Sequence, residues 1–265
     1  MEQEYNFIFY IILLYLIYRF ILFYFIEKFI NFENIPKEIG DNIKTNEPAE
    51  LPKIIHHICP TDFKKWNQKW FLCYHSWKSL YPPPEYTHMH WDDKELTEFI
   101  DTNYPWFSDM YKSYDVNIKR YDIARLFLLY HYGGIYADMD YIVYKNFFDE
   151  LPKDKISIPE SPYKWNEEIQ NSLMMSPPKQ EFWLLAIDAA YNKKDYDVFS
   201  ATGPQLLTPI YNKYPDLVNK LPVDLYNPNV YDSTTYDETK IYAKHLLTTV
   251  WNKSASNPSD VKYDK

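Results

Sequence analysis

Hydrophobic residues fill almost every position from Phe7 to Ile26, and only Arg19 interrupts the run. A helix rises about 1.5 Å per residue, so this run is long enough to span a hydrocarbon core of roughly 30 Å. The pattern predicts a transmembrane helix, with residues 1–30 as an N-terminal membrane anchor. A cleaved signal peptide is the alternative, but Glu2 and Glu4 stand where a basic front is usual, and bulky aromatic residues follow.

The segment after the apolar run is polar and contains residues that disfavour regular structure. Residues 31–51 include Pro36, Gly40 and Pro48, a composition typical of a stem or linker. Residues 52–265 then form the remaining domain, which is large enough to bury a core of its own.

Short apolar runs alternate with helical patterns from Pro52 onward. The alternation predicts an open, mainly parallel α/β sheet flanked by helices, in which ligands lie at the carboxyl ends of the strands. Asp92 or Asp93 can cap one helix and Thr202 another. The expected strands are 53–59, 86–91, 135–139 and 154–159, and the expected helices are 62–77, 95–100, 120–132, 179–191 and 204–214.

Residues 120–140 carry the strongest pattern in the chain. Helical spacing places one hydrophobic face on residues Ile123, Leu126, Phe127 and Tyr130. Asp122 and Arg125 stand three apart on another face of the same helix. Gly133 and Gly134, two of only four glycines, are expected to end this helix, because glycine enters the left-handed region without strain.

Two carboxylates follow the glycines. If residues 135–139 form a strand, alternation puts Tyr136, Asp138 and Asp140 on one face. Two carboxylates that converge at the end of a strand suit a hard divalent cation, whose free coordination sites a nucleotide diphosphate can fill. An Asp-x-Asp pair alone is common in turns and caps. Together with the preceding helix and the Gly-Gly break, the pair favours a functional site over a solvated turn or a surface ion pair.

Composition excludes several classes of protein. The net charge of −9 leaves no basic footprint for nucleic acid. The four glycines form no Walker, Rossmann or Gly-x-Ser-x-Gly pattern, which disfavours kinases, dehydrogenases and serine hydrolases. Glycosidases need two carboxyls on opposite sides of the scissile bond, whereas Asp138 and Asp140 are expected to lie side by side. The 27 Tyr and 8 Trp can line pockets that bind sugars.

The cysteines and the other histidines leave alternatives open. Cys59 and Cys73 are too few for a disulfide framework or a zinc motif, and they either pair in an oxidising lumen or remain buried thiols. His88 and His90 share one strand face and can bind a metal with a carboxylate, although a half-buried strand needs no such ligand. The His56-His57 pair is expected to be structural.

The stretch from Tyr121 to Asp140 resembles glycosyltransferase family 32, the sugar-binding-region family with the DXD motif. Its members include fungal initiating mannosyltransferases, mannosyltransferases that modify inositol phosphoceramide, and large bacterial glucosylating toxins. The resemblance implies a GT-A-type, Rossmann-like mixed sheet for residues 52–265. It continues at Pro52–Ile58, Trp91–Asp93, Asn171–Pro177 with Phe182-Trp183, Thr202–Pro204, and His245 with Trp251.

The resemblance also implies roles for individual residues. Asp122 and Arg125 would hold the donor sugar and its diphosphate, Asp138 would contact the sugar or ribose and assist the metal, and Asp140 would bind the metal directly. His245 would be a third metal ligand, with a structural histidine as the alternative. The remaining donor-binding residues would be Ile58 beside the nucleobase, Tyr136, Ala137, Asn171 and Gly203. Two departures from the family pattern are Cys59, where Trp is usual, and a shortened final motif over residues 244–251.

The implied function is a metal-dependent retaining glycosyltransferase that uses Mn²⁺ or Mg²⁺ and is catalytic through Asp122, Arg125, Asp138 and Asp140. We expect mannose to move from GDP-mannose to a lipid or glycan acceptor by front-face attack, with UDP-galactose, UDP-glucose and UDP-N-acetylglucosamine also open. The alternatives are a catalytically decayed, membrane-anchored protein that binds nucleotide sugar or glycan, and a hydrolase that consumes the donor.

The expected location is a Golgi or ER membrane with a lumenal catalytic domain. That placement follows from the family resemblance. The charges beside the apolar run favour the opposite orientation, because Lys28 follows the run and no Lys or Arg precedes it.

Overall fold

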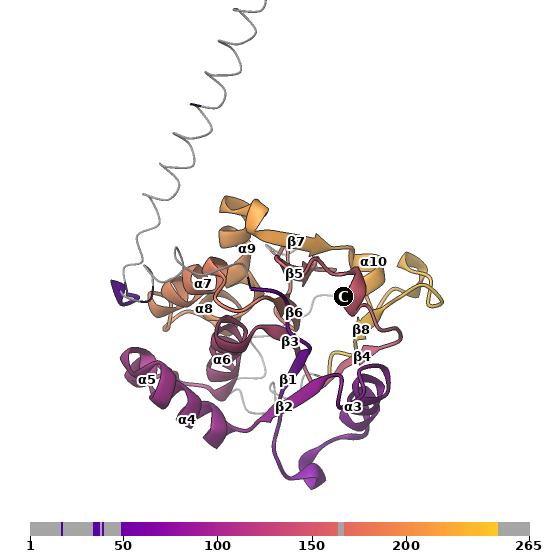
Figure 1. Ribbon diagram of the computed structural model, residues 1–265, viewed down its shortest axis with the longest axis horizontal. Coiled ribbons are helices and arrows are strands. Elements are labelled where there is room, and N and C mark those ends of the chain that lie inside the picture. Colours follow the sequence, from indigo (N-terminus) through magenta and orange to yellow (C-terminus); the bar gives the residue numbers. More distant parts are fainter. Residues whose placement is uncertain (1–16, 18–33, 38, 40–48, 164–166, 249–265) are drawn as a thin grey trace, which may run out of the picture.

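The structure is a computed structural model that describes residues 17, 34–37, 39, 49–163 and 167–248 (Figure 1). The expected membrane anchor over residues 1–30 lies almost entirely outside these described residues, as does most of the expected stem over residues 31–51. Within the described part, no helix combines the length and the apolar character that crossing a membrane requires. The expected division of the chain into anchor, stem and domain therefore stays a prediction.

A six-stranded sheet forms the centre of the described domain, with the strand order β2-β1-β3-β6-β5-β7 (Figure 1). A second, two-stranded sheet pairs β4 with β8. In chain order the strands are β1 (Ile54–Ile58), β2 (Thr87–Trp91), β3 (Gly134–Ala137), β4 (Tyr141–Val143), β5 (Ile156–Pro159), β6 (Leu173–Ser176), β7 (Val218–Leu221) and β8 (Ala243–His245).

The central sheet is mixed, with three parallel and two antiparallel pairings. Strand β1 runs parallel to β2 and β3, and β5 runs parallel to β7. Strand β6 is antiparallel to both β3 and β5. The expected mixed α/β sheet is confirmed. The sequence pattern had not identified β6 as a strand.

Helices cover both faces of the sheet and enclose two hydrophobic cores (Figure 1). Ile135 and Ala137 of β3 face one core and Tyr136 faces the other, which confirms the expected alternation along this strand. The helices are α3 (Gln68–Leu80), α4 (Asp93–Asn103), α5 (Pro105–Lys112), α6 (Asn117–Tyr132), α7 (Glu181–Tyr191), α8 (Val198–Ala201), α9 (Pro204–Lys213) and α10 (Val223–Tyr226), with short 3-10 turns η1 (Phe63–Lys65), η2 (Phe148–Glu150), η3 (Pro215–Leu217) and η4 (Ser233–Thr235).

Helix α6 differs from the expected one-faced amphipathic helix. Every residue from 122 to 130 is buried, because the helix packs against the sheet and against α4, α5 and α7. It begins at Asn117, three residues before the expected start at Arg120. Its end is as predicted: Gly133 has φ 67° and its N–H donates to the Leu129 carbonyl at 3.0 Å.

Gly134 is required where α6 turns into β3. Its φ is +95°, and a Cβ there would lie 2.5 Å from the Ile54 carbonyl oxygen of the neighbouring strand. We expect Gly134→Ala to lower the free energy of unfolding by about 2–4 kcal/mol, from backbone strain and steric overlap together. Urea denaturation measures this loss. Ala189→Gly, an ordinary glycine-alanine exchange within α7, is the control and should cost only about 1 kcal/mol. Equal losses in the two variants would contradict the steric argument.

Two local expectations are corrected, and one helix was missed. The helix expected over residues 62–77 is divided into η1 and α3, because the Asn67 side chain accepts from the Trp70 N–H at 2.9 Å and starts a new helix. Thr202 does not cap α9, whose N-cap is Gly203. Helix α5 was not anticipated. In contrast, the capping by Asp92 is confirmed, with a reciprocal capping box to Glu95.

Candidate active site

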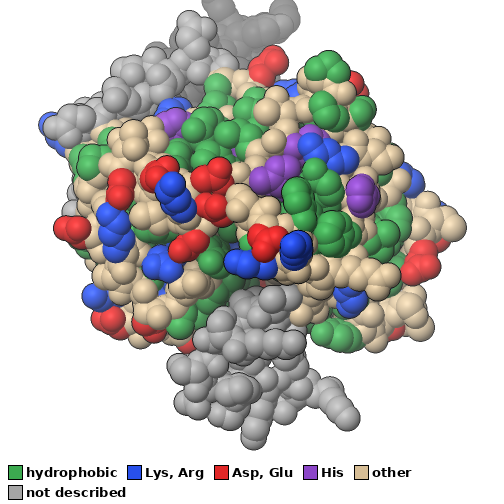
Figure 2. All heavy atoms as spheres, turned by 90° about the horizontal axis from the view of Figure 1, so that it is seen from below, with side chains coloured by type: hydrophobic (Ala, Val, Ile, Leu, Met, Phe, Trp, Pro, Cys, Tyr) green, Lys and Arg blue, Asp and Glu red, His purple; other side chains and the backbone are tan. Residues whose placement is uncertain are grey.

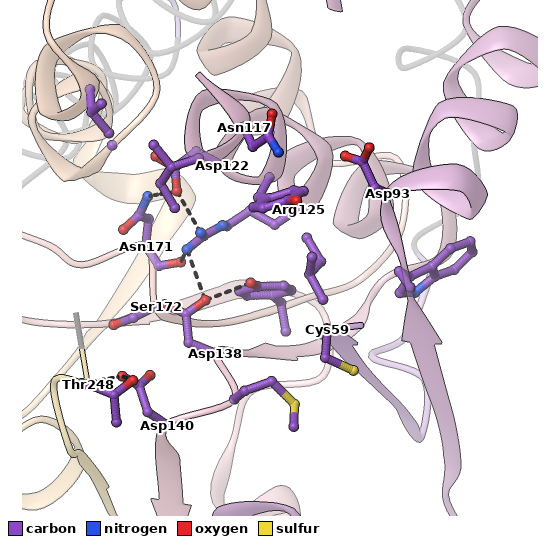
Figure 3. A pocket seen from close by; sticks show the side chains of 18 of the residues that line it. Cys59, Asp93, Asn117, Asp122, Arg125, Asp138, Asp140, Asn171, Ser172 and Thr248 are labelled. Atoms are coloured by element: carbon purple, nitrogen blue, oxygen red, sulfur yellow. Dashed lines mark hydrogen bonds and ion pairs between the residues drawn. The ribbon is translucent and has the colours of Figure 1, made fainter. Parts of the chain in front are cut away.

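A cavity of about 1170 Å³ opens where β1, β2 and β3 end (Figure 3). The amino end of the antiparallel strand β6 reaches the same edge of the sheet. The N-terminal half of α6, the α8–α9 junction and the segment after β8 complete the walls. The carboxyl edge of parallel strands is where α/β proteins bind ligands, so the cavity lies where the sequence predicts it.

The two aspartates of the Asp-x-Asp motif lie in a turn and not on a strand face. Strand β3 ends at Ala137, the Tyr141 N–H donates to the Asp138 carbonyl at 3.0 Å, and the Asp138 N–H donates to the Ser172 carbonyl at 2.9 Å. The expected strand to Met139 is therefore wrong in its last two residues. The two carboxylates nevertheless converge, because the turn folds back over the end of β3.

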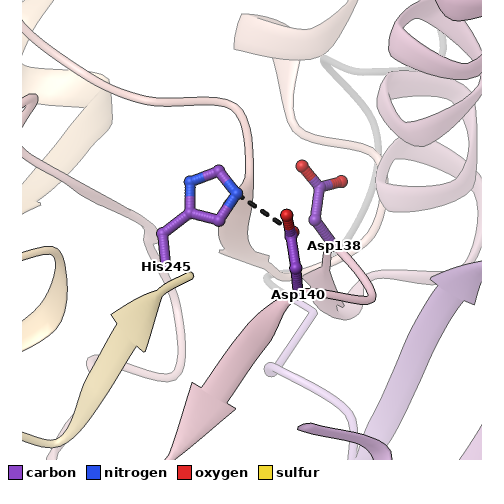
Figure 4. A group of neighbouring side chains, drawn as sticks. All are labelled: Asp138, Asp140 and His245. Carbon is purple, nitrogen blue, oxygen red and sulfur yellow. Dashed lines mark hydrogen bonds and ion pairs between the residues drawn. The ribbon is translucent and has the colours of Figure 1, made fainter. Parts of the chain in front are cut away.

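His245 completes a group of three potential metal ligands with Asp138 and Asp140 (Figure 4). One ligand atom from each residue lies within 4.8 Å of the others. Two carboxylate oxygens and one imidazole nitrogen suit a divalent cation such as Mn²⁺, so the donor set fits the expected metal. The structure brings the three predicted ligands together, and their binding of a metal stays a prediction.

Asp140 is held on both of its carboxylate oxygens. Oδ1 accepts from His245 Nε2 at 3.0 Å, while Oδ2 accepts from the N–H and the hydroxyl of Thr248 at 2.7 and 2.8 Å. Burial would raise the pKa of Asp140, but His245 and the two Thr248 donors hold that pKa well below its usual range. The carboxylate is therefore charged and fixed in place. No sequence pattern predicted the role of Thr248.

Arg125 lies at the centre of a buried network and not in a surface ion pair. Nη2 contacts Asp122 Oδ1 at 2.6 Å, Nη1 contacts Asp138 Oδ1 at 3.3 Å, and Nη1 also donates to the Asn171 carbonyl at 2.6 Å (Figure 3). The guanidinium lies 4.8 Å from the centre of the Tyr136 ring. Only 3% of Arg125 is exposed. The guanidinium thus links helix α6 to the motif turn.

Asp122 is engaged on both oxygens, although only the Arg125 contact was expected. The Asn171 amide donates to Oδ1 at 3.3 Å, and the Thr202 hydroxyl donates to Oδ2 at 3.2 Å. Burial raises the pKa of Asp122 to about 7, against the opposing effect of Arg125. Thr202, expected as a helix cap, instead positions this carboxylate.

Asp138 is also held by Tyr136, whose hydroxyl donates at 2.6 Å to Oδ1, the oxygen that Arg125 contacts. Burial raises the pKa of Asp138, and Arg125 opposes that rise. Of the other expected donor-binding residues, Ile58, Asn171 and Gly203 line the cavity.

Ala137 does not line the cavity. Its side chain is fully buried under the sheet, and its carbonyl accepts from His57 Nδ1 at 2.8 Å. Its predicted place among the donor-binding residues stays a prediction, which the buried side chain itself does not support. The side chain of the last residue of β3 points into the core because strand alternation sends it away from the Tyr136 side.

The remaining histidines have structural surroundings. His56 Nε2 donates to the Gly133 carbonyl at 2.9 Å, and burial lowers the pKa of His56 to about 4 and that of His57 to about 3, so both rings are neutral. His88 Nε2 donates to the Tyr81 carbonyl at 2.7 Å. Among the described residues, neither His88 nor His90 belongs to a group of three potential metal ligands.

Cys59 and Cys73 are free thiols in the structure, and both are buried. Burial raises the pKa of each thiol to about 12. The sequence left open a disulfide or two buried thiols, and the structure contains two buried thiols. Cys59 lies at the cavity beside Trp66 and Met139.

The comparison with protein families identifies this region. Residues 67–160 match a family described as the glycosyltransferase sugar-binding region containing the DXD motif. Residues 67–160 belong to this DXD family. The match includes Asp122, Arg125 and the Asp138-Met139-Asp140 triplet, which supplies the DXD pattern. The resemblance predicted from the sequence is confirmed, while His245 and Thr248 lie outside the matched residues.

Two curated proteins of Schizosaccharomyces pombe are similar to parts of the chain. Inositol phosphoceramide mannosyltransferase 3 is 44% identical over 98 residues, which are 37% of this chain and 26% of that protein. Inositol phosphoceramide mannosyltransferase 1 is 30% identical over 209 residues, which are 73% of this chain and 63% of that protein. The solved PaToxG glycosyltransferase aligns with 68% of this chain and 76% of its own, at 20% identity and a TM-score of 0.47. The chain thus spans less than two thirds of the length of either curated relative.

Proposed function

We propose that the protein is a metal-dependent, retaining glycosyltransferase of the GT-A type that transfers mannose from GDP-mannose to an inositol phosphoceramide-type lipid. One observation carries the proposal: Asp138, Asp140 and His245 come together in a large cavity beside the buried Asp122–Arg125 pair. The names of the curated relatives support mannose as the sugar and a phosphoinositol lipid as the acceptor.

The cavity is large enough for two substrates. Its volume of about 1170 Å³ exceeds the roughly 300–1,000 Å³ of pockets that enclose one drug-sized ligand. The outer wall carries Asp92, Asp93 and Glu98, which can accept hydrogen bonds from sugar or inositol hydroxyls. A nucleotide sugar and the head of a hydroxyl-rich acceptor can therefore lie in the cavity together.

Each residue of the site has a separate role in the proposed transfer. Asp138, Asp140 and His245 would hold a divalent cation, which supplies charge neutralisation for a departing nucleotide diphosphate. Arg125 fixes Asp138 and Asp122, and Asp122 faces the donor sugar. Both oxygens of Asp122 are engaged, by Arg125 and by Thr202, which favours a positioning role over that of a covalent nucleophile. This supports front-face attack by the acceptor hydroxyl, with retention of configuration.

The test is donor binding and turnover by the full chain. With Mn²⁺ present, GDP-mannose is expected to raise the melting temperature more than UDP-galactose, UDP-glucose or UDP-N-acetylglucosamine, because a ligand stabilises the state that binds it. Mannose should then appear on inositol phosphoceramide, and no mannosylated lipid should form when a chelator is present from the start. No shift with any donor would support a decayed protein that binds glycan, and a shift without transfer would support a decayed protein that binds nucleotide sugar. Free sugar without acceptor would support a hydrolase.

Thr248 offers a test of the metal role that needs no turnover. Thr248→Val removes the hydroxyl that orients Asp140 and keeps the backbone N–H donor. We expect Mn²⁺ affinity, measured by isothermal titration calorimetry, to fall about tenfold, the lower end of the range for residues that orient a metal ligand. Thr248→Ser retains a hydroxyl and should bind nearly as tightly as wild type. Equal Mn²⁺ affinity in all three proteins would show that the Thr248 hydroxyl does not support metal binding.

We further propose that residues 1–30 anchor the protein in the ER or Golgi membrane, with the catalytic domain in the lumen. The apolar run from Phe7 to Ile26 and the lipid acceptor named for the relatives support this placement. Protease treatment of sealed microsomes is the test. Digestion of the domain without detergent would show it on the cytoplasmic side, as the position of Lys28 would favour.

A further inference from the structure

Exposed hydrophobic rings and lysines gather at one corner of the protein, on η1 and the start of α3. We call this the η1–α3 surface and define it as residues Phe63, Lys64, Lys65, Lys69, Phe71 and Leu72. Phe63 is 56% exposed, Leu72 is 55% exposed and Phe71 is 37% exposed. Turn η1 lies at the lowest point of the domain in Figure 1, and Figure 2, seen from below, shows green hydrophobic and blue basic side chains side by side on this face.

The charge of this surface is opposite to that of the whole chain. The protein has a net charge of −9, yet residues 62–72 contain three lysines and only Asp62 as an acid. All three lysines are exposed, and none of them forms an ion pair with any other described residue. The surface is therefore a local basic patch with hydrophobic side chains between its charges.

The exposed rings rest on a fixed aromatic base. Trp66 is buried, its Nε1–H donates to the Pro60 carbonyl at 2.8 Å, and its ring centre lies 4.7 Å from that of Phe63 and 5.4 Å from that of Phe71. The rings are thus held outward by packing beneath them. Hydrophobic groups held outward on a preformed base are typical of a surface that contacts a partner.

The η1–α3 surface adjoins the opening of the cavity. Asp62, Lys65 and Trp70 line the cavity from the same segment. Trp70 Nε1–H also donates to Thr248 Oγ1 at 3.3 Å, and Thr248 holds Asp140. A partner bound to this surface therefore lies beside the cavity.

We propose that the η1–α3 surface inserts into the headgroup region of an anionic lipid bilayer, separately from any N-terminal anchor, and so places the opening of the cavity at the membrane surface. Aromatic and Leu side chains interleaved with Lys are the composition of interfacial membrane segments, whereas the cores of protein interfaces are depleted in Lys. Delivery of a bilayer-embedded acceptor to the cavity rests on the proposed function, and the membrane contact itself does not.

A fluorescent label at Leu72 tests the contact. The full chain carrying Leu72→Cys, labelled with an environment-sensitive dye, is reconstituted into vesicles of phosphatidylcholine with phosphatidylserine. We expect a blue-shifted emission that lipids with doxyl-labelled chains quench. Tyr196→Cys is the matched control, because Tyr196 is equally exposed at 59% but lies outside the η1–α3 surface. Background labelling is low because Cys59 and Cys73 are buried. A Leu72 label as water-exposed as the Tyr196 label would overturn the proposal.

The lysines provide a second measurement. Lys64→Glu with Lys69→Glu, in the Leu72→Cys background, should lower the ratio of inserted to water-exposed label by at least about tenfold, since each lysine near an anionic surface contributes roughly fivefold. Neither lysine lines the cavity, so GDP-mannose binding should not change. Quenching that is insensitive to these charges and to phosphatidylserine would overturn the electrostatic part. If the label inserts but the protein has no transferase activity, the membrane contact stands and only the proposed function is overturned.

Discussion

Replacing Asp140 with Asn is expected to lower kcat/KM for mannosyl transfer by about three orders of magnitude. A metal ion contributes several kcal/mol of charge stabilisation in the transition state, and each 1.36 kcal/mol changes the rate tenfold. Asp140 is the best-held of the three potential ligands, with one partner on Oδ1 and two on Oδ2. Asn keeps the size of the side chain and an oxygen that can accept from Thr248, but it loses the negative charge.

The measurement is steady-state transfer over a range of Mn²⁺ concentrations, beside a thermal unfolding curve. Asp216→Asn is the control, because Asp216 is an exposed acid on η3 that does not line the cavity. It should keep full activity. If Asp140→Asn retains turnover in the presence of a chelator, the cation has no part in the reaction and the proposed function must be abandoned.

Replacing Arg125 with Met is expected to lower the free energy of unfolding by about 3–5 kcal/mol. That is the usual cost of removing one partner from a buried ion pair, because the other charge remains buried without compensation. Here two carboxylates, Asp122 and Asp138, lose their shared cation. Urea denaturation measures the loss. Arg125→Lys keeps the charge but cannot contact Asp122, Asp138 and the Asn171 carbonyl at once, so we expect an intermediate stability.

A double substitution separates charge from packing. Asn at position 122 is neutral and can still pair with Asn171 and Thr202, so Asp122→Asn should recover part of the stability lost in Arg125→Met. If Arg125→Met is as stable as wild type, or if the two losses simply add, the buried network described above is not what holds α6 to the motif turn.

The sequence predicted the parts of the fold that depend on local pattern. Short apolar runs located β1, β2 and β3, and the two glycines located the end of α6. Strand β6 was not predicted, because its apolar run is only four residues long. Its antiparallel direction depends on contacts with β3 and β5, which the sequence pattern does not contain. The burial of every residue from 122 to 130 in α6 was also not predicted, because Asp122 and Arg125 are charged and only their mutual contact allows both to be buried.

In the candidate site, too, residues within a local motif were predicted and residues held by distant contacts were not. The Asp-x-Asp pattern was enough to name Asp138 and Asp140, and the resemblance to the DXD family named His245. The hydrogen bonds that Thr202 and Thr248 donate to the site were not predicted, since their partners lie 80 and 108 residues away and each threonine lies in an ordinary local sequence. Distant hydrogen bonds of this kind leave no periodic signal that a single sequence can reveal.

Strand β8 joins the site more than 100 residues after the motif turn, by pairing with β4. A polypeptide that stops before Ala243, through a premature stop codon or proteolysis, still contains all six strands of the central sheet. It lacks His245 and both Thr248 donors, so two of the three ligands remain and Asp140 is unsupported. If the proposed cation binds at this site, truncated chains are expected to hold it weakly and to lose the proposed transfer of sugar.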